Sequence, residues 1–113
     1  MNQVVHQFKA DFFKVLSHPA RLAILDYLRT GEKSVNELQT LLDADQSTIS
    51  QQLSRLRSGN LVNTRKDGTT VYYSIRDPMI FDLLDVAKEI FNRHLISHQE
   101  LLELVAEDGR LNE

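Results

Sequence analysis

With 113 residues, the chain is long enough for one small domain. Hydrophobic residues make up 42% of it, which is typical of a folded protein, and no run of about 18 apolar residues predicts a membrane span. The absence of cysteine excludes disulfides, thiolate metal sites and thiol redox switches. The first residues lack the pattern of a secretory signal, so we expect a cytoplasmic protein.

The net charge of −3 is distributed unevenly along the chain. Residues 46–76 contain five Lys/Arg and one Asp, a net charge of +4, whereas residues 77–113 carry a net charge of −6. Salt screens charges beyond about 10 Å, so a local basic patch matters more for phosphate binding than the total charge does. The middle third of the chain therefore favours an anionic partner such as nucleic acid.

Two helices are predicted in the first 30 residues. Apolar residues at helical spacing indicate a helix over about residues 3–17, and the sequence Ser-His-Pro at residues 17–19 ends it. Pro19 suits the first turn of a second helix, which extends to about Thr30. The first helix carries three of the five phenylalanines. Such a large apolar surface needs a core or a second subunit to cover it.

A helix-turn-helix is predicted over about residues 34–58. Ser34 with Glu37 three residues later forms a capping box that starts a third helix. A turn of about three residues separates it from a fourth helix, for which Asp45 is a good N-cap. Gly59 ends this fourth helix.

The fourth helix is expected to have one apolar stripe and one hydrogen-bonding face. Ile49, Leu53 and Leu56 make the stripe. The opposite face consists of Gln, Ser and Thr, with Arg near its end, in place of the Lys and Glu of an ordinary solvated helix. Such a face suits base edges and phosphates. The candidate DNA contacts of this helix are Gln46, Ser47, Thr48, Ser50, Gln51, Gln52 and Arg55. The alternative is a polar helix without a partner.

Residues 61–75 predict a β-hairpin, because two β-rich segments flank Asp67-Gly68. Two strands alone are marginally stable, so the hairpin must pack on the helices. Arg65, Lys66 and Thr69 are expected at its tip, where they would reach phosphates or the minor groove as a wing. On this interpretation, Arg65→Ala weakens all DNA binding and lowers its salt dependence.

The last helical region, about residues 78–106, carries an apolar stripe that either runs on as one helix or resumes after His98 as a separate short one. This stripe and the Phe-rich helix over about residues 3–17 are more apolar than a lone domain needs. We expect both to be dimerisation helices, because a two-fold dimer would present two recognition helices to two half-sites. The predicted fold class is mainly α with a small β-hairpin, one winged helix-turn-helix domain over residues 1–113.

In this order, the segments resemble the ArsR/SmtB family of bacterial winged-helix repressors. KVLSHPARLAIL at residues 14–25 is similar to the start of the family's second helix, and QSTISQQLSRL at residues 46–56 is similar to its recognition helix. GNLV at residues 59–62 and RKDGTTVYY at residues 65–73 are similar to its wing. The resemblance implies a homodimer that represses transcription at a palindromic DNA operator and is released by an effector. The alternative is a protein-interaction module without specific DNA binding, which would not need the basic segment.

The family's sensing residues are not matched. Where metal-sensing relatives carry cysteines in the third helix, this chain has Glu37-Leu38-Gln39, and only Asp77 remains of the zinc ligands of the last helix. His94 and His98 have a spacing that suits two imidazole ligands, but no third ligand is fixed. We therefore expect no resident cofactor, and we keep a regulatory divalent metal at these histidines, or a small-molecule effector, as candidates. No catalytic constellation is present, so we expect no enzyme.

Overall fold

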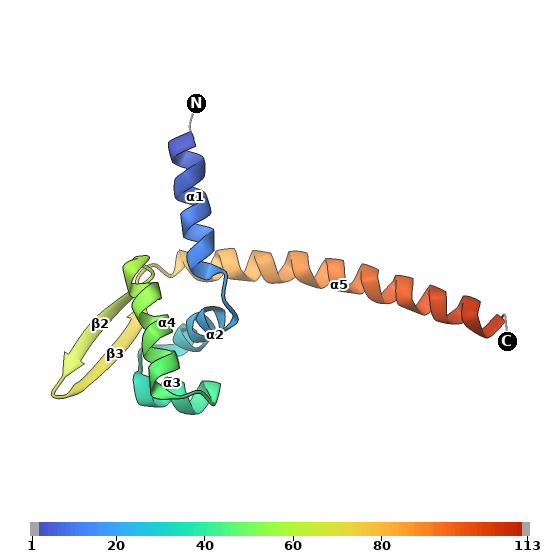
Figure 1. Ribbon diagram of the computed structural model, residues 1–113. Coiled ribbons are helices and arrows are strands. Elements are labelled where there is room, and N and C mark those ends of the chain that lie inside the picture. Colours follow the sequence, from blue (N-terminus) through green and yellow to red (C-terminus); the bar gives the residue numbers. More distant parts are fainter. Residues whose placement is uncertain (1–2, 112–113) are drawn as a thin grey trace. The chain divides into compact units, whose positions relative to one another are not determined.

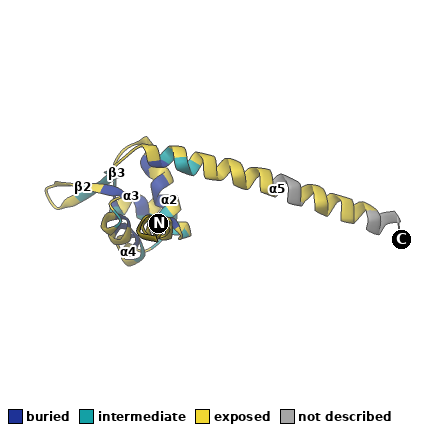
Figure 2. Ribbon diagram, turned by 90° about the horizontal axis from the view of Figure 1, so that it is seen from above, coloured by how far each residue is buried: buried dark blue, intermediate teal, exposed yellow. Residues whose placement is uncertain are grey.

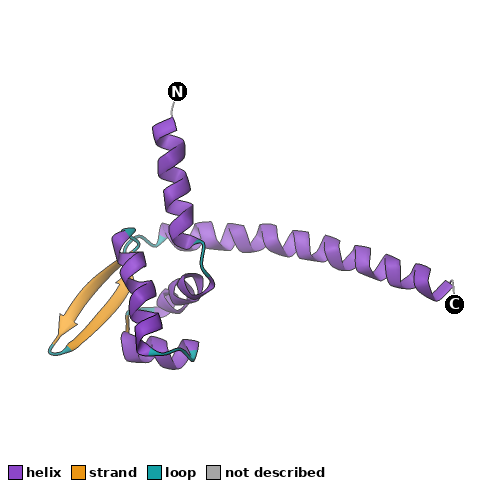
Figure 3. Cartoon of the chain, in the orientation of Figure 1, coloured by secondary structure: helices purple, strands orange, loops and turns teal. Residues whose placement is uncertain are grey.

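A computed structural model describes the backbone of residues 3–111 and the side chains of residues 3–94 and 99–107. The elements follow one another as α1 (Gln3–Leu16), α2 (Pro19–Tyr27), the 3-10 turn η1 (Leu28–Thr30), β1 (Lys33–Ser34), α3 (Val35–Leu42), α4 (Gln46–Ser58), β2 (Val62–Asp67), β3 (Thr70–Ile75) and α5 (Met79–Leu111) (Figures 1 and 3). The chain divides into two units, Met1–Pro78 and Met79–Glu113, and each is described by itself. The predicted fold class, mainly helical with a β-hairpin, is confirmed.

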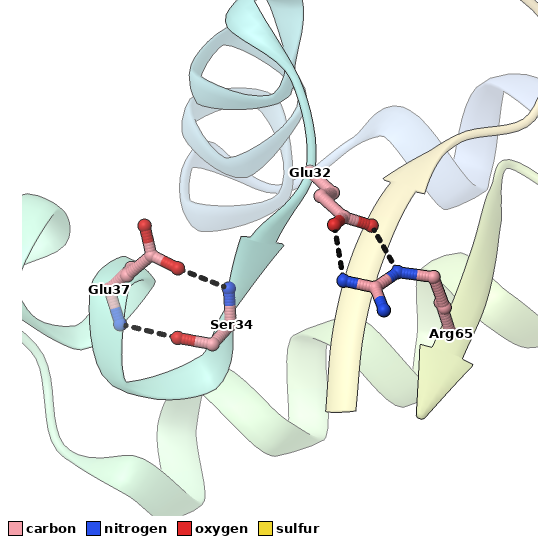
Figure 4. Close-up of polar contacts among 4 residues, drawn as sticks. All are labelled: Glu32, Ser34, Glu37 and Arg65. Carbon is pink, nitrogen blue, oxygen red and sulfur yellow. Dashed lines mark hydrogen bonds and ion pairs between the residues drawn. The ribbon is translucent and has the colours of Figure 1, made fainter. Parts of the chain in front are cut away.

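Specific caps start the helices of the first unit. The His18 Nδ1 accepts a hydrogen bond of 3.1 Å from the Ala20 N–H, directly before α2. Figure 4 shows the predicted capping box of α3, in which the Glu37 N–H donates to the Ser34 Oγ at 3.2 Å and the Ser34 N–H donates to the Glu37 Oε1 at 3.1 Å. These caps satisfy N–H groups that a helix leaves free at its start, so short polar motifs fix where the helices begin.

One core holds this first unit together. Helices α2, α3 and α4 pack against one another, and α4 also contacts β2. The burial pattern in Figure 2 follows this packing. The buried apolar side chains of the unit are Leu16, Ile24, Leu25, Leu28, Leu38, Ile49, Leu53, Leu56, Leu61 and Val62. Because α4 supplies three of them, its orientation is set by the core.

The sheet has three antiparallel strands in the order β1-β3-β2. The hairpin of β2 and β3 was expected, whereas β1, which pairs Lys33 with Tyr73 and Ser34 with Tyr72, was not. The turn also differs by one residue from the expected Asp67-Gly68. Asp67 pairs with Thr70, so Gly68 and Thr69 form the loop. Gly68 has φ +62°, a value that glycine adopts at little cost as the first residue of a two-residue hairpin loop.

The end of α4 has a different physical basis from the one the sequence suggests. Gly59 is the C-cap, but its φ is −81°, and the left-handed residue is Asn60 with φ 62°. Asparagine tolerates this conformation. Glycine is required at position 59 because a Cβ atom there would lie 2.9 Å from the Val15 Cγ1. The missing side chain therefore lets α1 approach the end of α4.

The second unit is the single helix α5, which continues to Leu111. The alternative of a separate short helix after His98 is therefore wrong, because the backbone stays helical through this position. Exposed apolar residues recur along α5 at Val86, Ile90, Phe91, Leu101, Leu102, Leu104 and Val105. Within the described part of the chain, no helix combines the length and the apolar character that a membrane crossing requires.

The capping box gives a first prediction. Ser34→Ala removes the oxygen that accepts the Glu37 N–H, so we expect the free energy of unfolding to fall by about 1 kcal/mol in chemical denaturation. Glu37→Gln is the matched control, because an amide oxygen can still accept the Ser34 N–H. It should change stability by less than about 0.5 kcal/mol. A Ser34→Ala variant as stable as the wild type would contradict this role.

Candidate nucleic-acid interface

Helix α4 has the two faces that its sequence predicts. Ile49, Leu53 and Leu56 are each 0% exposed and fix its inner face in the core. The outer face is polar and carries no acidic side chain. Its exposed candidates are Gln46, Ser47, Ser50, Gln51 and Arg55, and Thr48 is half-buried. The core therefore presents a row of uncharged hydrogen-bonding groups, with arginine at its end, to the outside.

Asp45 organises the start of α4. Its carboxylate accepts hydrogen bonds from the Thr48 N–H at 2.7 Å and from the Ser47 hydroxyl at 3.0 Å. The bond from the Thr48 N–H, together with that from Ser47, holds the pKa of Asp45 below its usual value. The carboxylate thus takes up part of the anion-binding capacity of the helix N-terminus. We therefore expect an anionic partner to contact the side chains of the outer face and not the N-terminus of α4.

Gln52 differs from the expectation that it borders the outer surface. It is buried on the core side of α4, between Ile49 and Leu56 along the helix, and it is 7% exposed. Its Oε1 atom has no hydrogen-bond partner among the described residues. The reason is geometric, because residue 52 follows Ile49 by three positions and so lies on the same side of the helix. We therefore remove Gln52 from the candidate contacts.

The two basic residues of the wing have different surroundings. Lys66 and Thr69 are exposed near the hairpin loop, as expected. Arg65 is instead paired with Glu32, with its Nε 3.0 Å and its Nη2 2.6 Å from the two carboxylate oxygens (Figure 4). This bidentate pair lowers the pKa of Glu32 and raises that of Arg65, mainly through the hydrogen bonds between them. No local sequence pattern indicates this partner, which lies 33 residues away.

Arg55 and Gln51 border a groove of about 820 Å³ between α4 and α1. Phe8, Phe12 and Val15 of α1 line its opposite side. Arg55 has no acidic partner among the described residues, so its guanidinium remains available to an anion.

The metal ligands considered from the sequence are not brought together by the part of the chain that is described. Among the described side chains, no three of His, Cys, Asp or Glu are placed to hold a metal ion. His94 is exposed on α5, and the side chain of His98 lies outside the described residues.

Two helices joined by a short turn, the second with an exposed polar face and followed by a β-hairpin, define a winged helix-turn-helix protein. More specifically, the chain belongs to the arsR family of bacterial regulatory proteins, whose family model matches residues 18–64. Its fold and family make it a transcriptional regulator. The family and the named relatives are regulators and not enzymes, which confirms the expectation that it is not an enzyme.

Three relatives illustrate the membership. The uncharacterized HTH-type transcriptional regulator Rv0081 of Mycobacterium tuberculosis is 40% identical over 103 residues, 90% of each chain. Its crystal structure has a TM-score of 0.76 and covers 83% of this chain and 95% of that one, at 41% identity. The homodimeric winged helix-turn-helix DNA-binding domain of Mb0332 from Mycobacterium bovis has a TM-score of 0.74 at 31% identity, over 84% and 90% of the two chains. The biofilm growth-associated repressor of Agrobacterium fabrum is 39% identical over 82 residues, 73% of this chain and 70% of that one.

The buried amide of Gln52 can be tested by stability. Gln52→Leu removes a buried carbonyl oxygen that lacks a partner, so we expect it to raise the free energy of unfolding by about 1 kcal/mol. Gln51→Leu, one residue away on the exposed face, is the control and should change stability by less than about 0.5 kcal/mol. A loss of stability in Gln52→Leu would mean that the amide has a hydrogen-bond partner and that its burial is useful.

Proposed function

We propose that this protein is a sequence-specific DNA-binding repressor that acts as a homodimer on a palindromic operator. The observation that carries the proposal is the outer face of α4, a row of Ser, Thr and Gln side chains without acids, held outward by a buried stripe on the opposite side. Such side chains bond to base edges and phosphates. Because its target is chromosomal DNA, we place its activity in the bacterial cytoplasm.

Recognition is divided between α4 and the wing. Helix α4 enters the major groove, where Gln51 can form two hydrogen bonds to adenine and the hydroxyls of Ser47 and Ser50 bond to bases or adjacent phosphates. Gln46, Thr48 and Arg55 lie beside them and bind at the border of the groove. Lys66 and Thr69 of the wing contact the backbone or the minor groove.

A second copy of the chain is the proposed cover for the apolar surface outside the core. In α1, Val4 is 81% and Phe8 75% exposed, and α5 carries further exposed apolar residues. Burying such surface drives association. The description of the Mb0332 domain as homodimeric supports the same arrangement. Two-fold symmetry would place two copies of α4 on two half-sites.

Selection of bound sequences from random DNA, with the stoichiometry measured by sedimentation, tests this proposal. We expect a palindromic motif bound by two chains. Binding that shows no sequence preference, or no binding at all, would overturn it in favour of a protein-interaction module that kept the winged fold.

Two variants separate base recognition from phosphate binding. Gln51→Ala should relax the preference at one base position of each half-site, with a loss of about 1–3 kcal/mol per contact. Lys66→Ala should weaken binding to all sequences alike and reduce the salt slope by about 1 per wing. Lys88→Ala removes the same charge from α5 and serves as the control. Competition titrations at several salt concentrations measure both effects, and a uniform loss in Gln51→Ala would contradict base reading.

We also propose that an effector releases the protein from DNA, and its chemistry is a further question for experiment. His94 and His98 are the candidate ligands if that effector is a divalent metal. Because no third ligand accompanies them by sequence spacing, we expect titration with Zn²⁺, Ni²⁺ or Co²⁺ to give binding weaker than micromolar. Tighter binding that His94→Ala abolishes would contradict this expectation and make the metal the effector. Glu103→Ala and His6→Ala would then test the two side chains that could complete such a site.

A further inference from the structure

The Arg65 side chain points across the sheet. Its position in the hairpin had suggested a phosphate contact at the tip. Arg65 of β2 pairs with Tyr72 of β3, and Tyr72 pairs with Ser34 of β1, so the three residues form one row. The Arg65 guanidinium lies over the Tyr72 ring, 4.7 Å from its centre. It then reaches Glu32, two residues before Ser34. The side chain therefore crosses β3 toward the segment that leads into α3.

The chemistry of this contact makes it directional. The guanidinium uses one edge, its Nε and Nη2 atoms, to donate to both carboxylate oxygens. A planar, bidentate pair fixes orientation as well as distance, and the aromatic ring below restricts the guanidinium further. A lysine at this position would keep the charge but could not form the same two-point contact.

The position of the contact decides what it can hold. The short strand β1 pairs with β3 only at Tyr72 and Tyr73. Beyond that row, β2 and β3 pair only with each other, Lys66 with Val71 and Asp67 with Thr70. The contact of Arg65 with Glu32 is thus made at the last row where strand pairing joins the hairpin to β1. Lys66 and Thr69 extend directly beyond it.

We propose that Glu32 is a positioning residue for the wing: its carboxylate holds Arg65 as a clamp, and the clamp directs Lys66 and Thr69 toward DNA. Arg65 is then a structural part of the wing and not a phosphate contact. The adjacent carboxylate offsets the guanidinium charge, which weakens its attraction for a phosphate. This inference rests on the proposed DNA binding, whose wing contacts it reassigns.

The clamp should affect the wing more than the fold. The Arg65 and Glu32 side chains are 53% and 38% exposed, and half-exposed ion pairs contribute little to global stability. Loss of the clamp is expected to leave the melting temperature nearly unchanged and to let the hairpin beyond Arg65 move. Lys66 then spends less time in its binding position.

Arg65→Lys is the decisive variant. If Arg65 is a clamp, Arg65→Lys and Arg65→Ala weaken binding to the selected operator alike, by about two- to fivefold, which is the range that a half-exposed ion pair supports. The salt slope stays that of the wild type, because Lys66 still contacts its phosphate in the complex and only the cost of ordering the wing rises. If Arg65→Lys binds like the wild type while Arg65→Ala lowers the slope by about 1, Arg65 is a phosphate contact and the proposal is overturned.

For Glu32→Gln, the clamp and simple electrostatics predict opposite changes in DNA affinity. Removing an acid near DNA should strengthen binding, and the matched control Asp67→Asn, on the same hairpin, is expected to do so. Glu32→Gln should instead weaken binding as Arg65→Lys does, and combining the two should add nothing further. Tighter binding by Glu32→Gln, or full additivity in the double variant, would overturn the clamp.

A measurement without DNA separates this inference from the proposed function. Hydrogen exchange of the amides of residues 66–71 should be faster in Glu32→Gln and Arg65→Lys than in the wild type, while exchange in α4 stays the same. Unchanged exchange in the hairpin overturns the clamp, as does faster exchange with unchanged operator affinity. If the wild type binds no DNA, the proposed function fails, and hydrogen exchange alone then decides whether the clamp exists.

Discussion

The burial of Ile49, Leu53 and Leu56 is the constraint on which the rest of this molecule depends. These three side chains are fully enclosed by α2, α3 and the sheet, so α4 cannot rotate about its own axis without exposing them. Each fully buried aliphatic side chain contributes about 1.5–3 kcal/mol, which is large relative to the stability of a small domain. The direction of every polar side chain on the opposite face follows from this one packing arrangement.

Local polar contacts then set the ends of the elements around that core. The capping box of Ser34 and Glu37 fixes the start of α3, and the Asp45 carboxylate fixes the start of α4. Gly59 permits the close approach of α1 to the end of α4. Each contact contributes little free energy, but together they fix the position of α4, which carries most of the proposed functional groups. The proposed interface therefore consists of polar side chains on a well-packed support, an arrangement that favours precise contact over adaptability.

Two acidic residues that precede the basic segment have defined structural roles. Asp45 bonds to the first turn of α4, and Glu32 bonds to Arg65. Both carboxylates are placed where they order the elements of the proposed interface, although each carries the charge that DNA repels. Counting charges along the chain treats Arg65 and Lys66 as equivalent. Their surroundings differ, because only Arg65 lies within reach of Glu32 across the sheet.

Much of the local structure follows from the sequence because its causes lie within a few residues. Helical spacing, Pro19 at the first turn of α2, the caps at Ser34 and Asp45, and the glycine near the hairpin loop were enough to predict the helix-turn-helix and the wing. The cap that His18 provides to α2 was not predicted. The errors occurred where one residue of register matters. Gln52 was assigned to the outer face with Gln51, although a helix turns 100° between them. The hairpin loop was placed at Asp67-Gly68, although strand pairing moves it to Gly68-Thr69.

By itself, the sequence determined the helices, the polar face of α4 and the basic character of the segment around it, because these depend on periodicity and composition. Only the tertiary structure decided which polar residues remain outside. It buried Gln52, added β1 as a third strand and joined Glu32 to Arg65. Such outcomes depend on contacts between residues far apart in the chain, and no local pattern encodes which distant partner a side chain will meet.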